Sequence, residues 1–139
     1  MNNRQTTIKN SVSLEGVGIH TGKDVKLTFH PAKENSGYVF RRVDLDDNPE
    51  IEALAKYVIN TQRGTTLEKD GVKLKTTEHV LAALVGLEID NIVIEINAEE
   101  PPIMDGSSKF FVDALKKAGL EELLSLIHIS EPTRLLSIA

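Results

Sequence analysis

The amino-acid sequence predicts an α+β two-layer sandwich, in which a mixed β-sheet carries two helices on one face. Short segments that alternate apolar and polar residues, a pattern typical of half-buried strands, recur through the first 75 residues. Helical patterns begin near Thr76 and again near Asp105 or Ser107. A strongly apolar strand, residues 91–96, lies between the two helical patterns. Strands and helices that each carry one apolar face must bury those faces against each other, which favours two layers.

The strands are expected mainly in the N-terminal half. The segments with strand patterns are residues 6–8, 12–19, 25–30 and 38–43. Residues 50–60 fit both a helix and a strand, and we favour extended structure there. The dipeptide Asp70-Gly71 predicts a hairpin between residues 65–68 and 72–75, because both residues readily adopt a positive φ. Glycines 16, 18 and 22 mark a tight turn, a bulge or a close approach of another group to the backbone.

Two helices complete the expected fold. Thr76 is the expected N-cap of the first helix, whose apolar residues recur at helical spacing through residues 80–87. The second helix carries Phe110 and Phe111 as core candidates, and Gly119 is expected to end it.

Composition and charge narrow the class of protein. A chain of 139 residues with 40% hydrophobic and 27% charged residues is typical of one globular domain. The net charge of −5 argues against nucleic acid as a partner. The longest apolar run, residues 80–85, predicts no transmembrane segment, and the polar first ten residues predict no signal peptide. The sequence has no Cys, which favours a cytoplasmic protein, and any zinc site must use His, Asp or Glu.

Glu78 and His79 stand in the first turn of the first predicted helix. The positive potential at a helix N-terminus favours an ionised Glu78 and a neutral His79. A carboxylate base beside a neutral imidazole suits a zinc hydrolase, in which one residue deprotonates water and the other binds the metal. Ala83 stands where the two-histidine zinc helix has its second His. On spacing alone, a capped helix with a surface His is therefore the favoured reading.

Five segments, in order and spacing, resemble the zinc-dependent UDP-3-O-acyl-N-acetylglucosamine deacetylases of lipid A biosynthesis. The segments are Gly16-Val17-Gly18-Ile19-His20-Thr21-Gly22, Phe40-Arg41-Arg42-Val43-Asp44-Leu45, residues 76–86, Asp90-Asn91-Ile92-Val93-Ile94-Glu95 and Pro102-Ile103-Met104-Asp105-Gly106-Ser107. Five matching segments in the same order and spacing are a specific signal. Together they favour His79 as a metal ligand, which the spacing alone did not. The resemblance covers residues 4–123. It implies a fold of two similar α/β layers with the active site between them, of which this chain is the first.

The resemblance also implies roles for the central pair. His79 is one ligand of zinc (Zn2+) and Glu78 is the general base for a zinc-bound water that attacks the N-acetyl carbonyl of the acylated UDP-amino sugar. The family's other two ligands, a His and an Asp, and the His that assists the leaving group lie in the second domain. The partner implied for this chain is therefore a C-terminal domain that its sequence lacks.

Other polar residues are weaker candidates. His20 lies in the glycine-rich turn that the family places near the active site, which implies that it binds substrate or supports the site. A histidine in a turn with no catalytic role is an equally weighted alternative. Thr65 lies where the family has a loop near the metal. His30 reads as the end of a strand. Arg41 and Arg42 could meet an anionic substrate, but adjacent strand residues face opposite ways, so at least one is expected to be a plain surface charge.

Residues 124–139 differ from the rest of the chain. Residues 124–134 are what one reading frame of a common transposase-based sequencing adapter would encode, and residues 135–139 have no assignment. We therefore expect the native domain to comprise residues 1–123, followed by a non-native tail. The leading hypothesis is an N-terminal fragment of a deacetylase, inactive alone. The alternative is a non-catalytic α+β module that shares the fold and serves in binding or assembly.

Overall fold

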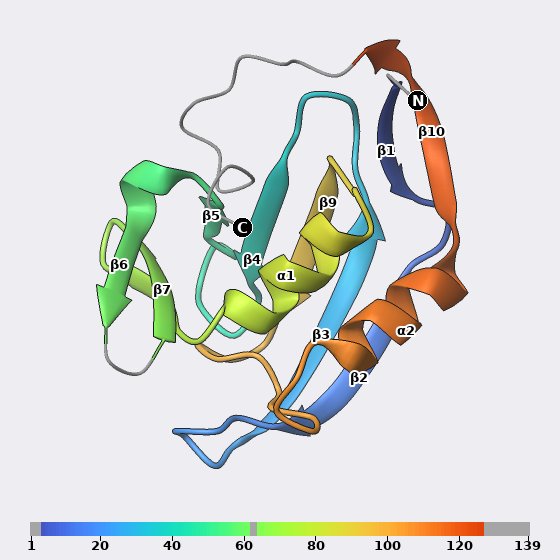
Figure 1. The fold of residues 1–139 in the computed structure, drawn as a ribbon. Helices are drawn as coiled ribbons and strands as arrows, with labels where there is room; N and C mark the ends of the chain where they lie inside the picture. The colour runs from blue at the N-terminus through green and yellow to red at the C-terminus, as the bar shows by residue number, and fades with distance from the viewer. Residues whose placement is uncertain (1–3, 62–63, 127–139) are drawn as a thin grey trace.

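In the computed structural model, the described residues are 4–61 and 64–126. The elements in these ranges are β1 (Arg4–Ile8), β2 (Val12–Val17), β3 (Asp24–Pro31), β4 (Tyr38–Arg42), β5 (Glu50–Glu52), the 3-10 helix η1 (Ala55–Tyr57), β6 (Val58–Thr61), β7 (Gly64–Lys69), β8 (Val72–Leu74), α1 (Glu78–Gly86), β9 (Ile92–Ile96), α2 (Lys109–Ala118) and β10 (Leu120–Leu126). The predicted α+β two-layer arrangement is confirmed, with α1 and α2 side by side over one face of the central strands (Figure 1).

The strands form three sheets within the described part of the chain. The central sheet has the order β2-β3-β9-β4-β5 and is mixed, because β4 and β9 run parallel while the other pairs are antiparallel. A second sheet, β6-β7-β8, and the pair β1-β10 are antiparallel. The ambiguous residues 50–60 contain β5, η1 and most of β6, which explains why both helical and strand patterns fit them.

A row of large side chains crosses the central sheet and forms the middle of the core. Phe29 pairs with Ile94, Ile94 pairs with Phe40, and Phe40 pairs with Ile51. None of the four side chains is exposed to solvent. Because neighbouring strands bring paired residues onto the same face, one alternating pattern per strand is enough to build this continuous apolar surface.

The two helices cover this surface. Their buried residues are Val80, Ala83 and Leu84 on α1, and Phe111, Leu115 and Ala118 on α2. The ring of Phe111 meets the ring of Phe29 edge to face, with 6.5 Å between centroids. Phe110, also expected in the core, is 42% exposed, and that prediction was wrong. Successive helical residues point in different directions, so only one of two adjacent phenylalanines can face the sheet.

The end of α2 leads into a strand that the sequence analysis missed. Gly119 ends the helix with a φ of +86°, as expected, and β10 then pairs with β1. Residues 124–126, which the sequence analysis assigns to the tail, form the end of β10. The rest of that expected tail, residues 127–139, lies outside the described residues. No helix in the described ranges has both the length and the apolar character needed to cross a membrane.

Candidate active site

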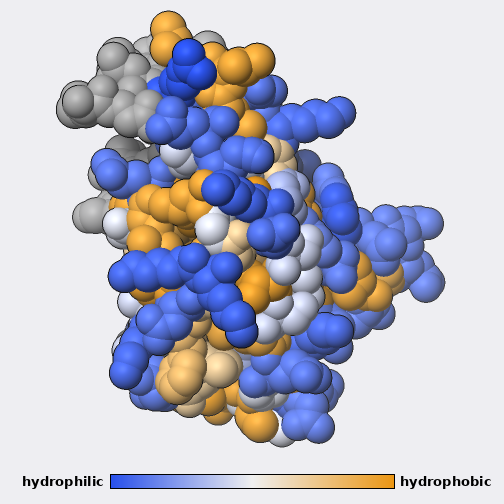
Figure 2. Space-filling view, turned by 90° about the vertical axis from the view of Figure 1, so that its right-hand side faces the viewer, coloured by the Kyte–Doolittle hydropathy of each residue, from blue (hydrophilic) through white to orange (hydrophobic). Residues whose placement is uncertain are grey.

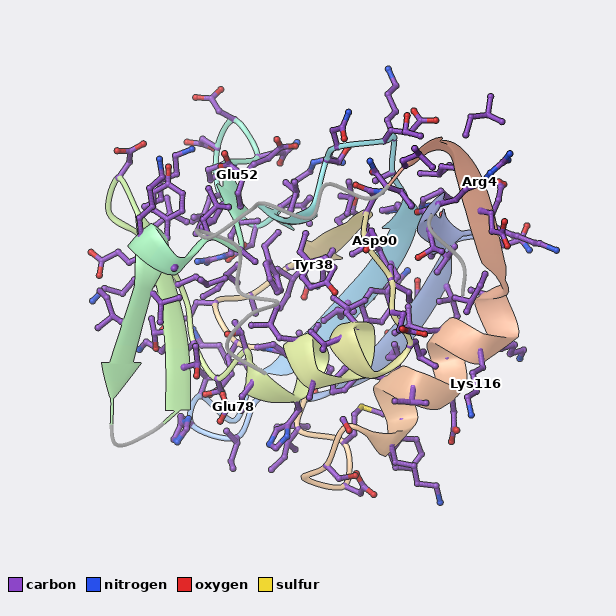
Figure 3. All side chains as sticks on the ribbon, turned by 45° about the horizontal axis from the view of Figure 1, so that its top comes forward. Arg4, Tyr38, Glu52, Glu78, Asp90 and Lys116 are labelled. Atoms are coloured by element: carbon purple, nitrogen blue, oxygen red, sulfur yellow. The ribbon has the colours of Figure 1, made fainter. Side chains whose placement is uncertain are left out.

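The carboxylate of Glu78 is held between the start of α1 and the start of β7 (Figure 3). The backbone N–H of Thr65 donates a hydrogen bond to Oε1 of Glu78 at 3.2 Å. A Cβ atom at Gly64 would lie 2.6 Å from Oε2 of Glu78, so only glycine leaves room for the carboxylate in this position. The predicted base is therefore half-buried against backbone atoms of a strand and does not extend freely into solvent. Thr65, a predicted substrate residue, contacts Glu78 through its backbone.

The start of α1 differs by one residue from the prediction. Thr77, and not Thr76, is the N-cap, and its hydroxyl donates to the carbonyl oxygen of Thr65 at 3.1 Å instead of capping the helix. Thr76 has a φ of +55°, a left-handed conformation that a β-branched residue rarely adopts. Its hydroxyl donates to Oε2 of Glu100 at 3.1 Å. Contacts with other elements, absent from any local pattern, thus decide how α1 begins.

His79 follows Glu78 in the first turn of α1, as the helical pattern predicts, and is half-buried. Its side chain lines a small cavity at this end of the molecule. Most of the other lining residues are apolar, and the set includes Ile19, Val80, Pro101, Pro102, Ile103 and Phe111. The imidazole of His79 therefore lies at the border of a small apolar cavity and outside the buried core.

His20 is anchored to a buried carboxylate that sequence reasoning missed. Nδ1 of His20 lies 2.7 Å from Oε2 of Glu100, and the backbone N–H groups of His20 and Thr21 donate to Oε1 at 2.9 and 3.2 Å. The side chain of Glu100 is completely buried. Burial by itself raises the pKa of Glu100, but the hydrogen bonds from His20, Thr21 and Thr76 outweigh it and leave the pKa below its ordinary value of 4.5.

Two signals in the sequence bear on Glu100, but neither identifies it. Gly18 was expected to mark a turn or a close approach, and a Cβ there would lie 2.6 Å from Oε1 of Glu100. The neighbour Glu99 has the same side chain but pairs with Lys75 at 2.8 Å on the surface. Only the path of the chain after β9 distinguishes the two glutamates, because it turns one carboxylate inward and the other outward.

Both arginines of the pair in the central sheet are paired with carboxylates of the same domain. Arg41 pairs with Glu50 at 2.9 Å on the surface. Arg42 is buried and grips Asp44 with two nitrogens, at 2.9 and 2.7 Å, while a third donates to the carbonyl of Lys73. The hydrogen bond from Arg42 lowers the pKa of Asp44 below its ordinary value. Arg41 is therefore the plain surface charge that was expected, and Arg42 joins β4 to β8.

His30 also stays away from the cavity at α1. Its Nδ1 lies 2.8 Å from the hydroxyl of Ser11, and its Nε2 lies 3.4 Å from a carboxylate oxygen of Glu95. His30 stands near the end of β3, as its position before Pro31 predicted.

The described residues do not complete a metal centre by themselves. No group of three or more His, Asp or Glu side chains in residues 4–61 and 64–126 is arranged to hold a metal ion. A catalytic zinc ion takes three protein ligands and keeps one position for water or substrate. The imidazole of His79 is suited to be one such ligand, so the remaining ligands would have to come from outside the described part of the chain.

The structure thus places a glutamate and a histidine at the start of a helix that borders a cavity, and such a pair of side chains is typical of zinc hydrolases. The sequence of the chain matches the family model described as LpxC, UDP-3-O-acyl N-acetylglycosamine deacetylase, over residues 5–137. The chain belongs to this family of deacetylases, as the sequence resemblance predicted.

Curated relatives agree with the family and show how much of it the chain represents. It is 52% identical over 118 residues to a bifunctional enzyme LpxC/FabZ of Chlorobaculum tepidum, matching 85% of this chain and 25% of that protein. It is 50% identical over 119 residues to a UDP-3-O-acyl-N-acetylglucosamine deacetylase of Marinobacter nauticus, matching 86% of this chain and 39% of that protein. A UDP-3-O-acyl-N-acetylglucosamine deacetylase of Idiomarina loihiensis is 47% identical over 135 residues, matching 94% of this chain and 44% of that protein. The chain therefore spans between a quarter and less than half of these relatives.

Proposed function

We propose that this chain supplies one half of the active site of a zinc-dependent deacetylase acting on an acylated UDP-N-acetylamino sugar. The single observation that carries the proposal is the fixed position of the Glu78 carboxylate next to His79 at the start of α1. The relatives' names supply the substrate, and this segment supplies the base and one metal ligand. A cytoplasmic setting remains a prediction of the sequence.

Each residue of the pair has its own task. Glu78 has one carboxylate oxygen held by the N–H of Thr65, and the other oxygen accepts a proton from the attacking water. His79 binds the metal through a ring nitrogen at the cavity border. Zinc, when bound, polarises the substrate carbonyl and lowers the pKa of water towards neutrality. His20 and Thr65 are proposed to contact the substrate next to this pair.

The proposal predicts an inactive fragment. With one proposed zinc ligand among the described residues, the 139-residue chain should bind zinc weakly and release no acetate from the acylated UDP-sugar. Activity requires the second domain, which brings the remaining ligands. Measurable acetate release by the purified 139-residue chain would contradict this assignment of an incomplete site.

The decisive experiment restores a second half. A chimera joins this segment to the remaining part of the Marinobacter nauticus deacetylase, and its zinc content and steady-state rates are measured. Glu78→Gln keeps the size of the side chain but cannot accept a proton, so turnover should fall by roughly 10²–10⁴-fold while zinc content stays near normal. His79→Ala removes a ligand, so zinc content and activity should fall together.

Glu88→Gln, just after α1, is the matched control and should change neither readout. If Glu78→Gln lost its zinc, or His79→Ala kept it, the roles of base and ligand would be wrongly assigned. A chimera that folds but neither binds zinc nor releases acetate would instead favour the non-catalytic binding or assembly module.

A further inference from the structure

The carboxylate of Glu100 is saturated with hydrogen-bond donors. Its Oε1 accepts the backbone N–H groups of His20 and Thr21, and its Oε2 accepts the hydroxyl of Thr76 and faces Nδ1 of His20. An ionised carboxylate offers about four lone-pair sites and no proton, so all of its sites are engaged. At Nδ1 of His20, which lies 2.7 Å from Oε2, the ring must therefore be the donor.

The donor role of Nδ1 also determines the state of Nε2, the second ring nitrogen of His20. In a neutral imidazole one nitrogen carries the proton and the other carries a lone pair, and the partner of one nitrogen decides which. Within the described part of the chain, no residue is hydrogen-bonded to Nε2 of His20. The ring is partly exposed, with 30% of its side-chain surface accessible, whereas Glu100 is completely buried. Because the buried carboxylate of Glu100 binds Nδ1, the partly exposed ring of His20 presents Nε2 towards solvent.

We propose that Glu100 is a positioning residue, which holds the ring of His20 in its Nδ1–H tautomer and makes Nε2 a hydrogen-bond acceptor for a hydroxyl or N–H group of the substrate. Thr76 connects this pair to the start of α1, where Glu78 and His79 lie. Its hydroxyl donates to Glu100, and it directly precedes the N-cap of α1. The role towards substrate rests on the proposed function, whereas the tautomer is measured without any activity.

The tautomer is read directly from long-range ¹H–¹⁵N spectra of the ¹⁵N-labelled 139-residue chain at about pH 8, above the usual histidine pKa of about 6.5. His20→Gln assigns the signals of this ring among the four histidines of the chain. We expect His20 to be predominantly the Nδ1–H tautomer. A ring that is predominantly Nε2–H in the unsubstituted chain overturns the proposal outright, whatever the variants do.

Glu100→Gln is the sharpest variant, because the amide keeps an acceptor for the two backbone N–H groups but places a donor at Nδ1. The ring should then change to the Nε2–H tautomer. Glu99→Gln, one residue earlier and on the surface, and Glu95→Gln, beside His30, are matched controls that should leave the His20 signals unchanged.

A second variant displaces the carboxylate of Glu100 without replacing Glu100 itself. Gly18→Ala places a Cβ 2.6 Å from Oε1 of Glu100, so the carboxylate must shift and the Nδ1–H tautomer should lose its dominance. This variant gives an answer even if Glu100→Gln does not fold. Retention of the Nδ1–H tautomer in either folded variant would show that Glu100 does not control the ring.

The active chimera tests the role towards substrate. Glu100→Gln should raise KM by about tenfold, the loss of one hydrogen bond, with a smaller change in kcat, while Glu99→Gln changes neither. An unchanged KM in Glu100→Gln overturns the acceptor role. If the unsubstituted chimera is inactive, the proposed function fails, while the tautomer measurement still decides whether Glu100 positions His20.

Discussion

Two regions of the molecule differ in how closely their atoms are packed. The first, which we call the α1 rim, comprises Gly18, His20, Gly64, Glu78 and Glu100. Two of its glycines lie so close to carboxylate oxygens that an added Cβ would come within 2.6 Å of each. An alanine at either glycine would force a hydrogen-bonded carboxylate to move, so side-chain changes in the rim should disturb the contacts around it.

The second region is the β1–β10 edge. Leu124 and Leu126 at its end are 81% and 67% exposed. Figure 2 shows this side of the molecule, where hydrophobic patches are interspersed with hydrophilic side chains. The carbonyl of Leu126 accepts a hydrogen bond from the buried amide of Gln5 at 2.8 Å. Backbone hydrogen bonds hold this edge, and its outward side chains contribute little. Mutations in the rim should therefore cost far more stability than mutations at the edge.

The largest effect is expected for Gly64→Ala in the rim. The φ of Gly64 is +121°, which L-residues rarely adopt, and the new Cβ would displace the carboxylate of Glu78. We expect a loss of about 2–3 kcal/mol in the free energy of unfolding. Gly22→Ala is the control, because Gly22 also has a positive φ but open space around it. Urea unfolding of both variants measures the difference; equal losses would show that backbone strain alone is responsible.

A somewhat smaller effect is expected for Glu100→Gln, and it depends on pH. At neutral pH the variant should lose about 1–3 kcal/mol, because a charged acceptor of several hydrogen bonds is replaced. The folded-state pKa of Glu100 is lowered, so its contribution is fully present above its ordinary pKa of 4.5 and is lost as the pH falls through the folded-state pKa.

The stability difference between the wild-type chain and Glu100→Gln should therefore shrink below about pH 4.5. The lowered pKa values of Asp44 and Asp105 destabilise both proteins in acid, so only the difference isolates Glu100. Urea titrations at several pH values measure it. A difference that grows on acidification would mean that burial, and not the hydrogen bonds, dominates at Glu100.

An effect of about 1 kcal/mol is expected from shortening the edge. A chain that ends at residue 123 lacks the carbonyl of Leu126, so the amide of Gln5 loses one acceptor and β1 loses its partner opposite Arg4. A chain that ends at residue 126 keeps both. We propose that residues 127–139 are a non-native tail, so that this second truncation should leave the melting temperature unchanged. A clear loss on removing residues 127–139 alone would refute the proposed tail.

The smallest effect on stability is expected for Leu124→Ser at the edge. A side chain with 81% exposure has little buried surface to lose, so the free energy of unfolding should change by less than about 0.5 kcal/mol. Aggregation should decrease, because exposed apolar clusters associate. Light scattering beside a thermal melt gives both quantities. A substantial loss of stability would show that Leu124 is packed in solution.

Local pattern was enough to place most of the elements. The hairpin at Asp70-Gly71 forms as predicted, with positive φ at both residues, and Gly119 ends α2. Glu78 and His79 stand in the first turn of α1, which the helical spacing after them had indicated. These features depend on the conformational preferences of a few neighbouring residues, and such preferences are written in the sequence itself.

Tertiary structure decided which strands pair and which side chains are buried or in contact. β10 escaped prediction because its pairing with β1 joins the two ends of the described chain, and no local period signals such a partner. Phe110 and Phe111, or Glu99 and Glu100, have the same residue type and differ in burial. The sequence by itself determined the family, the two layers and the place of the Glu78–His79 pair. The buried carboxylate beside His20 emerged only in the fold, because its four hydrogen-bond donors come from segments far apart in the chain.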